Sequence, residues 1–283
     1  MAQLATNGFD QPTMKPRSVI LDLFGDYLRY SGSEVKAGDL VALLAAFGIE
    51  PATARVTLSR LRKEGWFTTR RNGRETIYML GAHLLSVLDE GRARIFADYE
   101  EEWDGTWTTV IHQSETPDRL TRDRLRRQLS WLGFGQLTTS TWLSPRHGSG
   151  HLETLVAEFP DVVFTVMRSQ TDDIRADRDL AGRCWDLGRI DDRYREFLSS
   201  QLHVADTASS LSGAEALVAR TTLIAAYRHF PFVDPWLPLE LRPDSWHGSE
   251  ANELFRSAHR DLGPAACAFV TDVTGQVLDA PPV

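Results

Sequence analysis

Three amphipathic segments and a two-residue turn signal, all within residues 16–80, restrict the possible folds of this chain more than any other feature. The first two segments repeat apolar residues at i, i+3, i+4 and i+7, the spacing of one buried helical face: Ile20, Leu23, Phe24 and Tyr27, then Leu40, Leu43, Leu44 and Phe47. Gly48 is typical of a helix C-terminus, and Pro51 suits the first position of the next helix. The tight connection of about three residues between these helices predicts a helix-turn-helix.

The third helix, about Pro51 to Glu64, presents two different faces. One narrow arc is apolar and should face the core; it holds Ala54, Leu58 and Leu61. The opposite face combines side chains that read base edges with side chains that bind phosphate. Its candidate DNA contacts are Thr53, Arg55, Val56, Ser59, Arg60 and Lys63.

A β-hairpin is expected directly after this helix. Two strand-like runs, Phe67–Arg71 and Arg74–Met79, are joined by Asn72-Gly73, a strong hairpin signal. Three arginines crowd its tip: Arg70, Arg71 and Arg74. A helix-turn-helix with a basic hairpin is a winged helix, in which the third helix enters the major groove of DNA and the wing contacts the backbone or minor groove. The alternative interpretation is a small helical bundle with an exposed basic hairpin.

Charge is distributed unevenly along the chain, whose formal net charge is −8. Residues 14–80 carry eleven Lys/Arg and seven Asp/Glu, whereas residues 81–283 carry twenty Lys/Arg and thirty-one Asp/Glu. A basic block on an acidic body is typical of a DNA-contacting module attached to a sensing or dimerising part. Chance variation in the solvated surface would give the same counts.

The remaining sequence predicts a linking helix over 83–103 and then a βαββαβ order, which is the ferredoxin-like pattern. Its predicted strands are Trp107–His112, Phe134–Thr138, Thr141–Ser144 and Val162–Met167. Further helices are expected over Asp191–His203, Gly213–His229 and Ser249–Leu262. The predicted fold class is therefore α+β and multidomain: an N-terminal winged helix-turn-helix, a central ferredoxin-like domain and a C-terminal helical domain. The expected segments are a disordered tail 1–13, the winged helix 14–82, the linking helix 83–104, the ferredoxin-like domain 105–175 and the helical domain 176–283.

Catalytic and metal-binding motifs are not found in the sequence. His147 and His151 are four residues apart, but the glycines between them favour a mobile loop, and no metal or cofactor is expected. Cys184 and Cys267 follow no metal or redox spacing and are interpreted as reduced thiols of a cytosolic protein. No apolar run approaches the roughly 18 residues of a membrane span. Candidate ligand contacts come from an arginine-rich helix near residues 119–127, from the eight tryptophans and from a later arginine. They are Arg122, Arg126, Trp131, Trp142, Arg228 and Trp236.

Five segments carry a resemblance to a known family. They are ARVTLSRLRKEGWF (54–67), RLRRQLSWLGFGQL (124–137), CWDL (184–187), YRHFPFVDPWLP (227–238) and RPDSWHGSEA (242–251). In this order they resemble the PaaX family of bacterial transcriptional regulators. The resemblance implies a homodimer that represses by occupying promoter DNA and is released by an aryl-CoA thioester such as phenylacetyl-CoA.

Two alternatives to an effector-controlled repressor remain open at the level of sequence. The first is a DNA-binding regulator that is controlled by a protein partner and has no small-molecule ligand. The second is a nuclease, because the middle domain is similar to small CRISPR-associated ferredoxin-like nucleases. Those enzymes carry an acidic residue at the end of the first strand, where this chain has His112 and Gln113. Nuclease activity is therefore not transferred, and the chain is not expected to be an enzyme.

Overall fold

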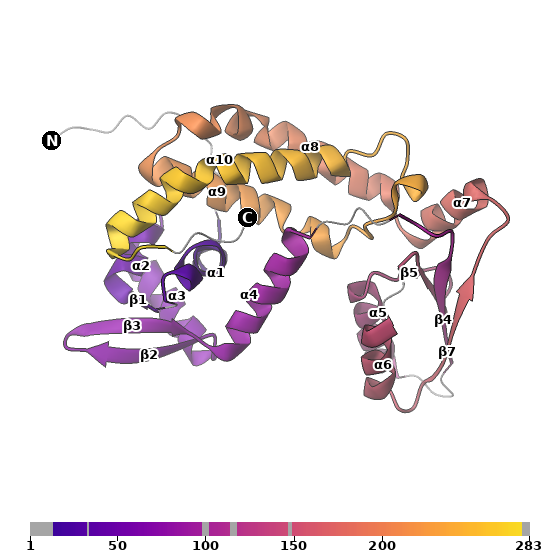
Figure 1. Cartoon of the computed structure of the whole chain (residues 1–283). Helices are drawn as coiled ribbons and strands as arrows, with labels where there is room; N and C mark the ends of the chain where they lie inside the picture. The colour runs from indigo at the N-terminus through magenta and orange to yellow at the C-terminus, as the bar shows by residue number, and fades with distance from the viewer. Residues whose placement is uncertain (1–13, 33, 98–101, 114–117, 147–148, 279–283) are drawn as a thin grey trace. The chain divides into compact units, whose positions relative to one another are not determined.

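The computed structural model describes residues 14–32, 34–97, 102–113, 118–146 and 149–278 (Figure 1). The expected tail 1–13 and His147 lie outside these ranges, and so does the side chain of His151. The chain forms two compact units, each built from separate segments. Unit 1 comprises Met1–Ala93, Gln201–Tyr227 and Glu253–Val283, and unit 2 comprises Arg94–Ser200 and Arg228–Asn252. The predicted α+β, multidomain fold class is confirmed, whereas the expected limits of the three consecutive domains stay a prediction.

The N-terminal part of unit 1 is a winged helix. Its elements are α1 (Pro16–Asp26), the 3-10 turn η1 (Leu28–Tyr30), β1 (Glu34–Lys36), α2 (Ala37–Ala45), α3 (Pro51–Lys63), β2 (Phe67–Asn72) and β3 (Glu75–Leu80). The strands form one antiparallel sheet in the order β1-β3-β2. Strand β1 is too short to show an alternating pattern, so the sequence did not predict it. The connection from α2 to α3 has five residues rather than about three, because α2 ends before Phe47.

The tip of the wing differs by one residue from the prediction. Asn72 pairs with Glu75, so the two loop residues are Gly73 and Arg74 rather than Asn72 and Gly73. Gly73 has a φ of 60°, and a positive φ at the first loop position alone is the pattern of a type II′ turn. In this register the buried Phe67 and Tyr78 share one face of the sheet, where their ring centroids lie 6.1 Å apart.

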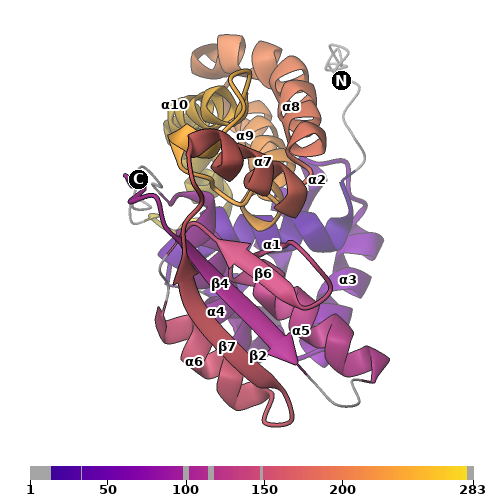
Figure 2. The same cartoon turned by 90° about the vertical axis from the view of Figure 1, so that its right-hand side faces the viewer.

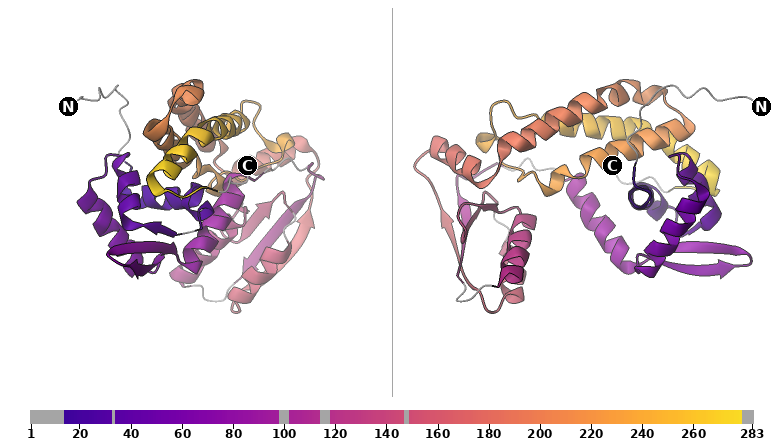
Figure 3. Two further views of the ribbon diagram at one scale, coloured as in Figure 1. Left: turned by 60° about the vertical axis from the view of Figure 1, so that its left-hand side comes forward. Right: turned by 180° about the vertical axis from the view of Figure 1, so that it is seen from behind.

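Helices from the C-terminal part of the chain complete unit 1 (Figure 3). Helix α9 (Gly213–Tyr227) packs on α1, and it lies beside α10 (Gly248–Thr274), where the rings of Tyr227 and Phe255 stack with centroids 4.1 Å apart. Helix α10 extends twelve residues beyond the predicted end at Leu262. The helix continues through Pro264 because Leu262, Ala266 and Val270 keep one buried face at a spacing of four residues.

A buried ionic cluster ties α1 to these helices within unit 1. Asp26 at the end of α1 is 1% exposed. Its carboxylate lies 3.1 Å from Nε2 of His259 in α10 and 3.0 Å from Nε of Arg220 in α9. Arg92, on helix α4 (Ala82–Ile95), approaches the same carboxylate at 3.9 Å. The winged helix is therefore anchored to the C-terminal helices by charge as well as by apolar packing.

Unit 2 is built around a four-stranded antiparallel sheet with the order β5-β6-β4-β7 (Figure 2). Its elements are β4 (Trp107–Gln113), α5 (Arg119–Trp131), β5 (Gly135–Gln136), β6 (Thr141–Ser144), α6 (Ser149–Glu158) and β7 (Val163–Ser169). This order is that of the predicted ferredoxin-like fold. The linking helix is shorter than the expected 83–104, because α4 ends at Ile95 and residues 102–106 form a turn in which Asp104 accepts a hydrogen bond from the Thr106 N–H.

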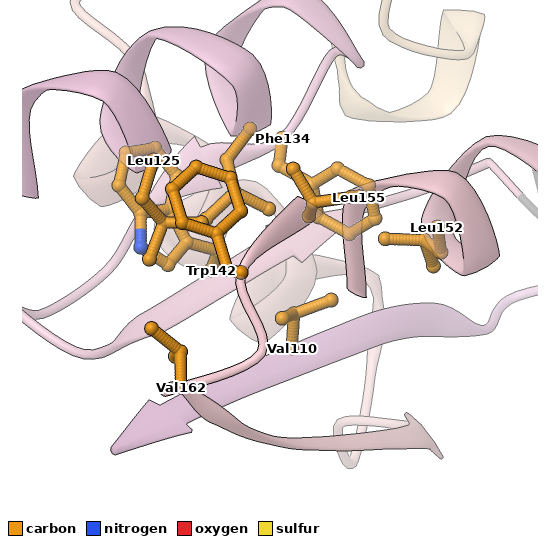
Figure 4. Close-up of a cluster of buried hydrophobic side chains, with 9 residues drawn as sticks. Val110, Leu125, Phe134, Trp142, Leu152, Leu155 and Val162 are labelled. Atoms are coloured by element: carbon orange, nitrogen blue, oxygen red, sulfur yellow. The ribbon is translucent and has the colours of Figure 1, made fainter. Parts of the chain in front are cut away.

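The two faces of this sheet are covered to different extents within unit 2. Helices α5 and α6 cover one face over an apolar cluster that includes Val110, Leu125, Trp142 and Leu155 (Figure 4). The other face carries Trp107, whose indole donates a 2.7 Å hydrogen bond to Asp177. Asp177 lies on α7 (Ile174–Cys184), a helix that the sequence analysis did not separate. The remaining elements are α8 (Leu187–Thr207) and three 3-10 turns: η2 (Ala208–Ser210), η3 (Phe230–Phe232) and η4 (Leu239–Leu241).

Candidate DNA interface and ligand cavity

Helix α3 presents the predicted polar face to solvent. Ala54, Leu58 and Leu61 are buried, which fixes the rotation of the helix about its axis. The opposite side is exposed along its length, with Val56 at 70%. Thr53, Arg55, Arg60 and Lys63 are also exposed, and Ser59 is half-buried. An exposed, charged helix face without apolar cover has the form that a major groove accepts.

The cations of α3 differ in how they are held. Arg60 donates from Nε to Glu64 at 2.9 Å, and Arg17 of α1 binds the same carboxylate. Hydrogen bonds from Arg17 and Arg60 lower the pKa of Glu64 below its usual value. By contrast, Arg55 and Lys63 make no ion pair with any residue that the structure describes. Of the candidate contacts on α3, these two are the cations that no described carboxylate pairs with.

The wing arginines also differ in whether an ion pair holds them. Arg70 donates from Nη2 to Glu34 of β1 at 2.7 Å, which lowers the pKa of Glu34. Arg71 and Arg74 at the tip are exposed and have no ion-pair partner within the described part of the chain. Arg70 therefore links β2 to β1 within the sheet, while Arg71 and Arg74 at the tip have no described counter-charge.

A cavity of about 490 Å³ lies within unit 2. That volume is in the range of about 300–1,000 Å³ that small-molecule sites occupy. Its lining includes six aromatic residues: Trp131, Phe134, Trp142, Trp185, Phe232 and Trp236. Three arginines, Arg94, Arg126 and Arg146, also line it. The combination suits a ligand that has both an aromatic group and negative charge.

One wall of the cavity is a stack of three side chains. The guanidinium carbon of Arg94 lies 3.5 Å from the centroid of the Trp131 ring, and its Nη2 donates to the Trp131 carbonyl at 3.1 Å. The Trp131 and Phe232 rings stack at 5.3 Å with planes 23° apart. These contacts fix the position of the Trp131 ring in the wall of the cavity.

Glycine is required where β5 meets another wall of the cavity. A Cβ atom at Gly135 would lie 2.4 Å from Cε2 of Trp185 and 2.7 Å from Cβ of Cys184. Only a residue without a side chain lets the strand pack against the Trp185 ring at this distance. Burial raises the pKa of the Cys184 thiol to about 11, so this sulfur is held in its neutral form.

Four of the six candidate ligand residues lie together in this cavity: Arg126, Trp131, Trp142 and Trp236. Arg122 and Arg228 do not line it. The sequence analysis missed Arg94, Arg146 and Phe232, which come from three separate parts of the chain. The one available signal was the YRHFPFVDPWLP segment (227–238), which supports the family resemblance but does not by itself indicate a cavity.

Within the described ranges, no group of three His, Cys, Asp or Glu side chains is placed to hold a metal ion. Likewise, no helix in these ranges has the length and hydrophobicity needed to cross a membrane. Strand β4 ends in His112 and Gln113, so the described sheet places no carboxylate at that position.

A winged helix with an exposed polar face on α3, followed in the chain by a ferredoxin-like unit with a cavity lined in part by aromatic residues, defines a multidomain winged-helix protein. Family models for PaaX-like proteins match nearly the whole chain: the PaaX-like model at residues 15–84, the central Cas2-like domain at 100–181 and the C-terminal domain at 185–272. The chain belongs to the PaaX family.

Two relatives extend this assignment. The chain is 32% identical to the transcriptional repressor PaaX of Escherichia coli (strain K12) over 263 residues, which cover 90% of this chain and 83% of the relative. It is also similar to the solved structure of an uncharacterized protein from Mycobacterium tuberculosis, with a TM-score of 0.67 and 27% identity. That likeness covers 92% of this chain and 98% of the other.

Proposed function

We propose that this protein is a transcriptional repressor that binds double-stranded promoter DNA through α3 and the wing. The observation that carries the proposal is the exposed face of α3. On this face Arg55 and Lys63 make no ion pair within the described residues, and Val56 is exposed. Arg55 would read a base edge, and Lys63 with the tip residues Arg71 and Arg74 would bind phosphates. The related repressor of Escherichia coli supports the same role.

We propose further that the repressor acts as a homodimer. A two-fold dimer would place two α3 helices on half-sites about one helical turn, or a multiple of it, apart. Strand β7 offers a surface for such pairing, because among the described strands it pairs with β4 alone. Its exposed side chains include Val163, Val166 and Met167. An open strand edge with exposed apolar residues is a ready site for association.

The proposed effector is an aryl-CoA thioester that binds in the cavity of unit 2. The aromatic wall formed by Trp131, Trp142 and Phe232 would hold the aryl group. Arg126 is exposed as well as cavity-lining, so its guanidinium is placed to meet a phosphate of the CoA part outside. Arg122 lies one helical turn earlier on the same face of α5 and would extend this cationic strip. Release from DNA requires that the effector bind the DNA-free arrangement more tightly.

Arg55→Ala tests the DNA interface. We expect it to weaken binding to the specific promoter fragment by about 1–3 kcal/mol, as for a lost base contact, and to leave binding to unrelated DNA nearly unchanged. Fluorescence anisotropy with the DNA upstream of the protein's own gene measures both, and wild-type binding should fall steeply with salt. Arg127→Ala removes an equally exposed arginine from α5 and serves as the control. Equal losses in the two variants would contradict the interface.

Arg126→Ala tests the effector site. Phenylacetyl-CoA at about a hundred times its Kd should stabilise the wild type by about 2.7 kcal/mol, because a ligand bound by the folded state alone raises stability by mass action. Thermal unfolding should show most of this shift lost in Arg126→Ala and retained in Arg127→Ala, since the neighbouring arginine does not line the cavity. Thermal unfolding is also measured with free CoA alone and with free phenylacetate alone. No shift of the wild type with any acyl-CoA would favour control by a protein partner instead.

A further inference from the structure

Trp236 lines the cavity in an unusual backbone conformation. Its φ is 51°, and it is the sole non-glycine residue with positive φ among those that the structure describes. A side chain with a Cβ atom rarely adopts this left-handed region, because Cβ then crowds the backbone carbonyl. Such conformations persist where surrounding contacts over-determine them, and they gather at ligand sites.

The contacts that hold Trp236 involve both polar groups of its backbone. The Trp236 N–H donates to Oδ1 of Asp234 at 2.6 Å, and its carbonyl accepts from Nη2 of Arg146 at 2.9 Å. Asp234 is itself fixed, because the Tyr194 hydroxyl donates to Oδ2 at 2.6 Å. Pro235, between the two residues, adds a rigid φ. We call this arrangement of Asp234, Pro235, Trp236 and Arg146 the Trp236 clamp.

The members of the clamp belong to the cavity and not to a remote part of unit 2. Asp234, Pro235, Trp236 and Arg146 all line it. Because φ sets the direction of the Cα–Cβ bond, the left-handed conformation decides where the indole ring stands in the wall. A relaxed conformation at this position would move a large aromatic side chain away from its present place and change the shape of the cavity.

We propose that Trp236 determines which acyl groups the cavity accepts, by closing it to groups larger than one aromatic ring, and that Asp234 and Arg146 are positioning residues that hold it there. This inference rests on the proposed effector site. It adds a specificity determinant and a physical reason for the strained backbone, neither of which follows from the site alone.

The backbone part of the proposal is tested by comparing Trp236→Gly with Trp236→Ala in thermal unfolding. Both variants remove the indole, but glycine adopts positive φ without crowding and alanine does not. We expect Trp236→Gly to have the higher Tm, opposite to the usual order of these residues. Asp234→Ala should lower Tm at least twice as much in the wild type as in the Trp236→Gly background. A higher Tm for Trp236→Ala, or equal losses in both backgrounds, would overturn the clamp.

The specificity part is tested with two probes, phenylacetyl-CoA and the bicyclic 1-naphthylacetyl-CoA, in calorimetric titration. We expect the wild type to prefer the monocyclic probe by at least tenfold. Trp236→Gly and Trp236→Ala should lose this preference, and Trp236→Phe should keep most of it. Trp103→Phe, in a tryptophan that does not line the cavity, is the control. An unchanged preference in both small-residue variants would overturn the assignment of Trp236.

The two tests separate failure of the inference from failure of the proposed function. If the wild type binds neither acyl-CoA, the effector proposal fails, while the Tm comparison still decides whether the backbone of Trp236 is strained. If the wild type binds phenylacetyl-CoA and the Trp236 variants show wild-type selectivity, the effector proposal stands and the specificity inference fails.

Discussion

Asp26→Ala is expected to lower the free energy of unfolding by about 3–5 kcal/mol, the largest effect of any single change considered in this protein. The variant leaves the Arg220 guanidinium, 4% exposed, without its counter-charge. The hydrogen bonds between Nε2 of His259 and Asp26 are lost at the same time. An unpaired charge enclosed in a protein interior costs far more than the pair itself contributes, because no water replaces the lost partner.

Chemical denaturation at neutral pH measures this loss. Asp89→Ala is the matched control, because Asp89 also pairs with an arginine, Arg29, but is 56% exposed in its side chain. Exposed pairs of this kind contribute roughly 0–1 kcal/mol. An Asp26→Ala variant no less stable than Asp89→Ala would show that the buried cluster does not anchor the winged helix.

The pH dependence of stability gives a second readout of the same cluster. Burial lowers the pKa of His259, and the opposing attraction of Asp26 does not restore it. Burial raises the pKa of Asp26, but His259, Arg220 and Arg92 outweigh that effect and the net pKa is lowered. For both groups the unfolded chain binds protons more readily than the folded one. Stability should therefore decline as pH falls below about 6.5, the ordinary His value, and decline further below about 4.

Val56→Glu is expected to reduce promoter affinity by about 2–4 kcal/mol while stability changes by less than about 0.5 kcal/mol. The side chain is 70% exposed, so the fold does not depend on it. In the proposed complex, however, the new carboxylate would face the phosphates and the electronegative base edges of the major groove. Apolar contact between Val56 and a thymine methyl group would be lost as well.

Electrophoretic mobility shift with the promoter fragment measures the affinity, and thermal unfolding measures the stability. Leu120→Glu is the matched control, because Leu120 is another apolar residue on a helix surface, 81% exposed, outside the proposed interface. Promoter binding by Val56→Glu at the level of Leu120→Glu would remove α3 from the reading role.

Local sequence patterns predicted the parts of the fold that depend on residues close together in the sequence. The buried arc of Ala54, Leu58 and Leu61 and the exposed face opposite it follow from helical periodicity, so α3 and its orientation were available from the sequence. The loop of the wing was placed one residue too early, because the Asn72-Gly73 signal indicates a turn but not its register, and the ladder continues to the Asn72–Glu75 pair. Helix α10 passed Pro264 because a continuous packing surface outweighed a residue that usually ends helices.

The cavity was predictable only in part. Tryptophans and arginines gave plausible candidates, and Arg126, Trp131, Trp142 and Trp236 meet in one place. Arg94 and Phe232 lie 138 positions apart and join the same wall through stacking on Trp131, a contact that no local pattern encodes. Nor could the sequence reveal the conformation of Trp236, because its left-handed backbone depends on the guanidinium of Arg146, 90 positions away, as well as on the nearby Asp234 carboxylate.

Unit 1 is assembled from three separate segments of the chain, and this limits how the protein could be engineered. The winged helix shares its interior with Gln201–Tyr227 and Glu253–Val283, and its Asp26 pairs with Arg220, which lies 194 positions away. An excised module ending near residue 82 would expose the face of α1 that contacts α9 and remove Arg220 and His259, the partners of Asp26. Chimeric sensors made from this family should therefore exchange the reading surface of α3 by grafting, with both C-terminal segments retained, rather than transplant the N-terminal region as a cassette.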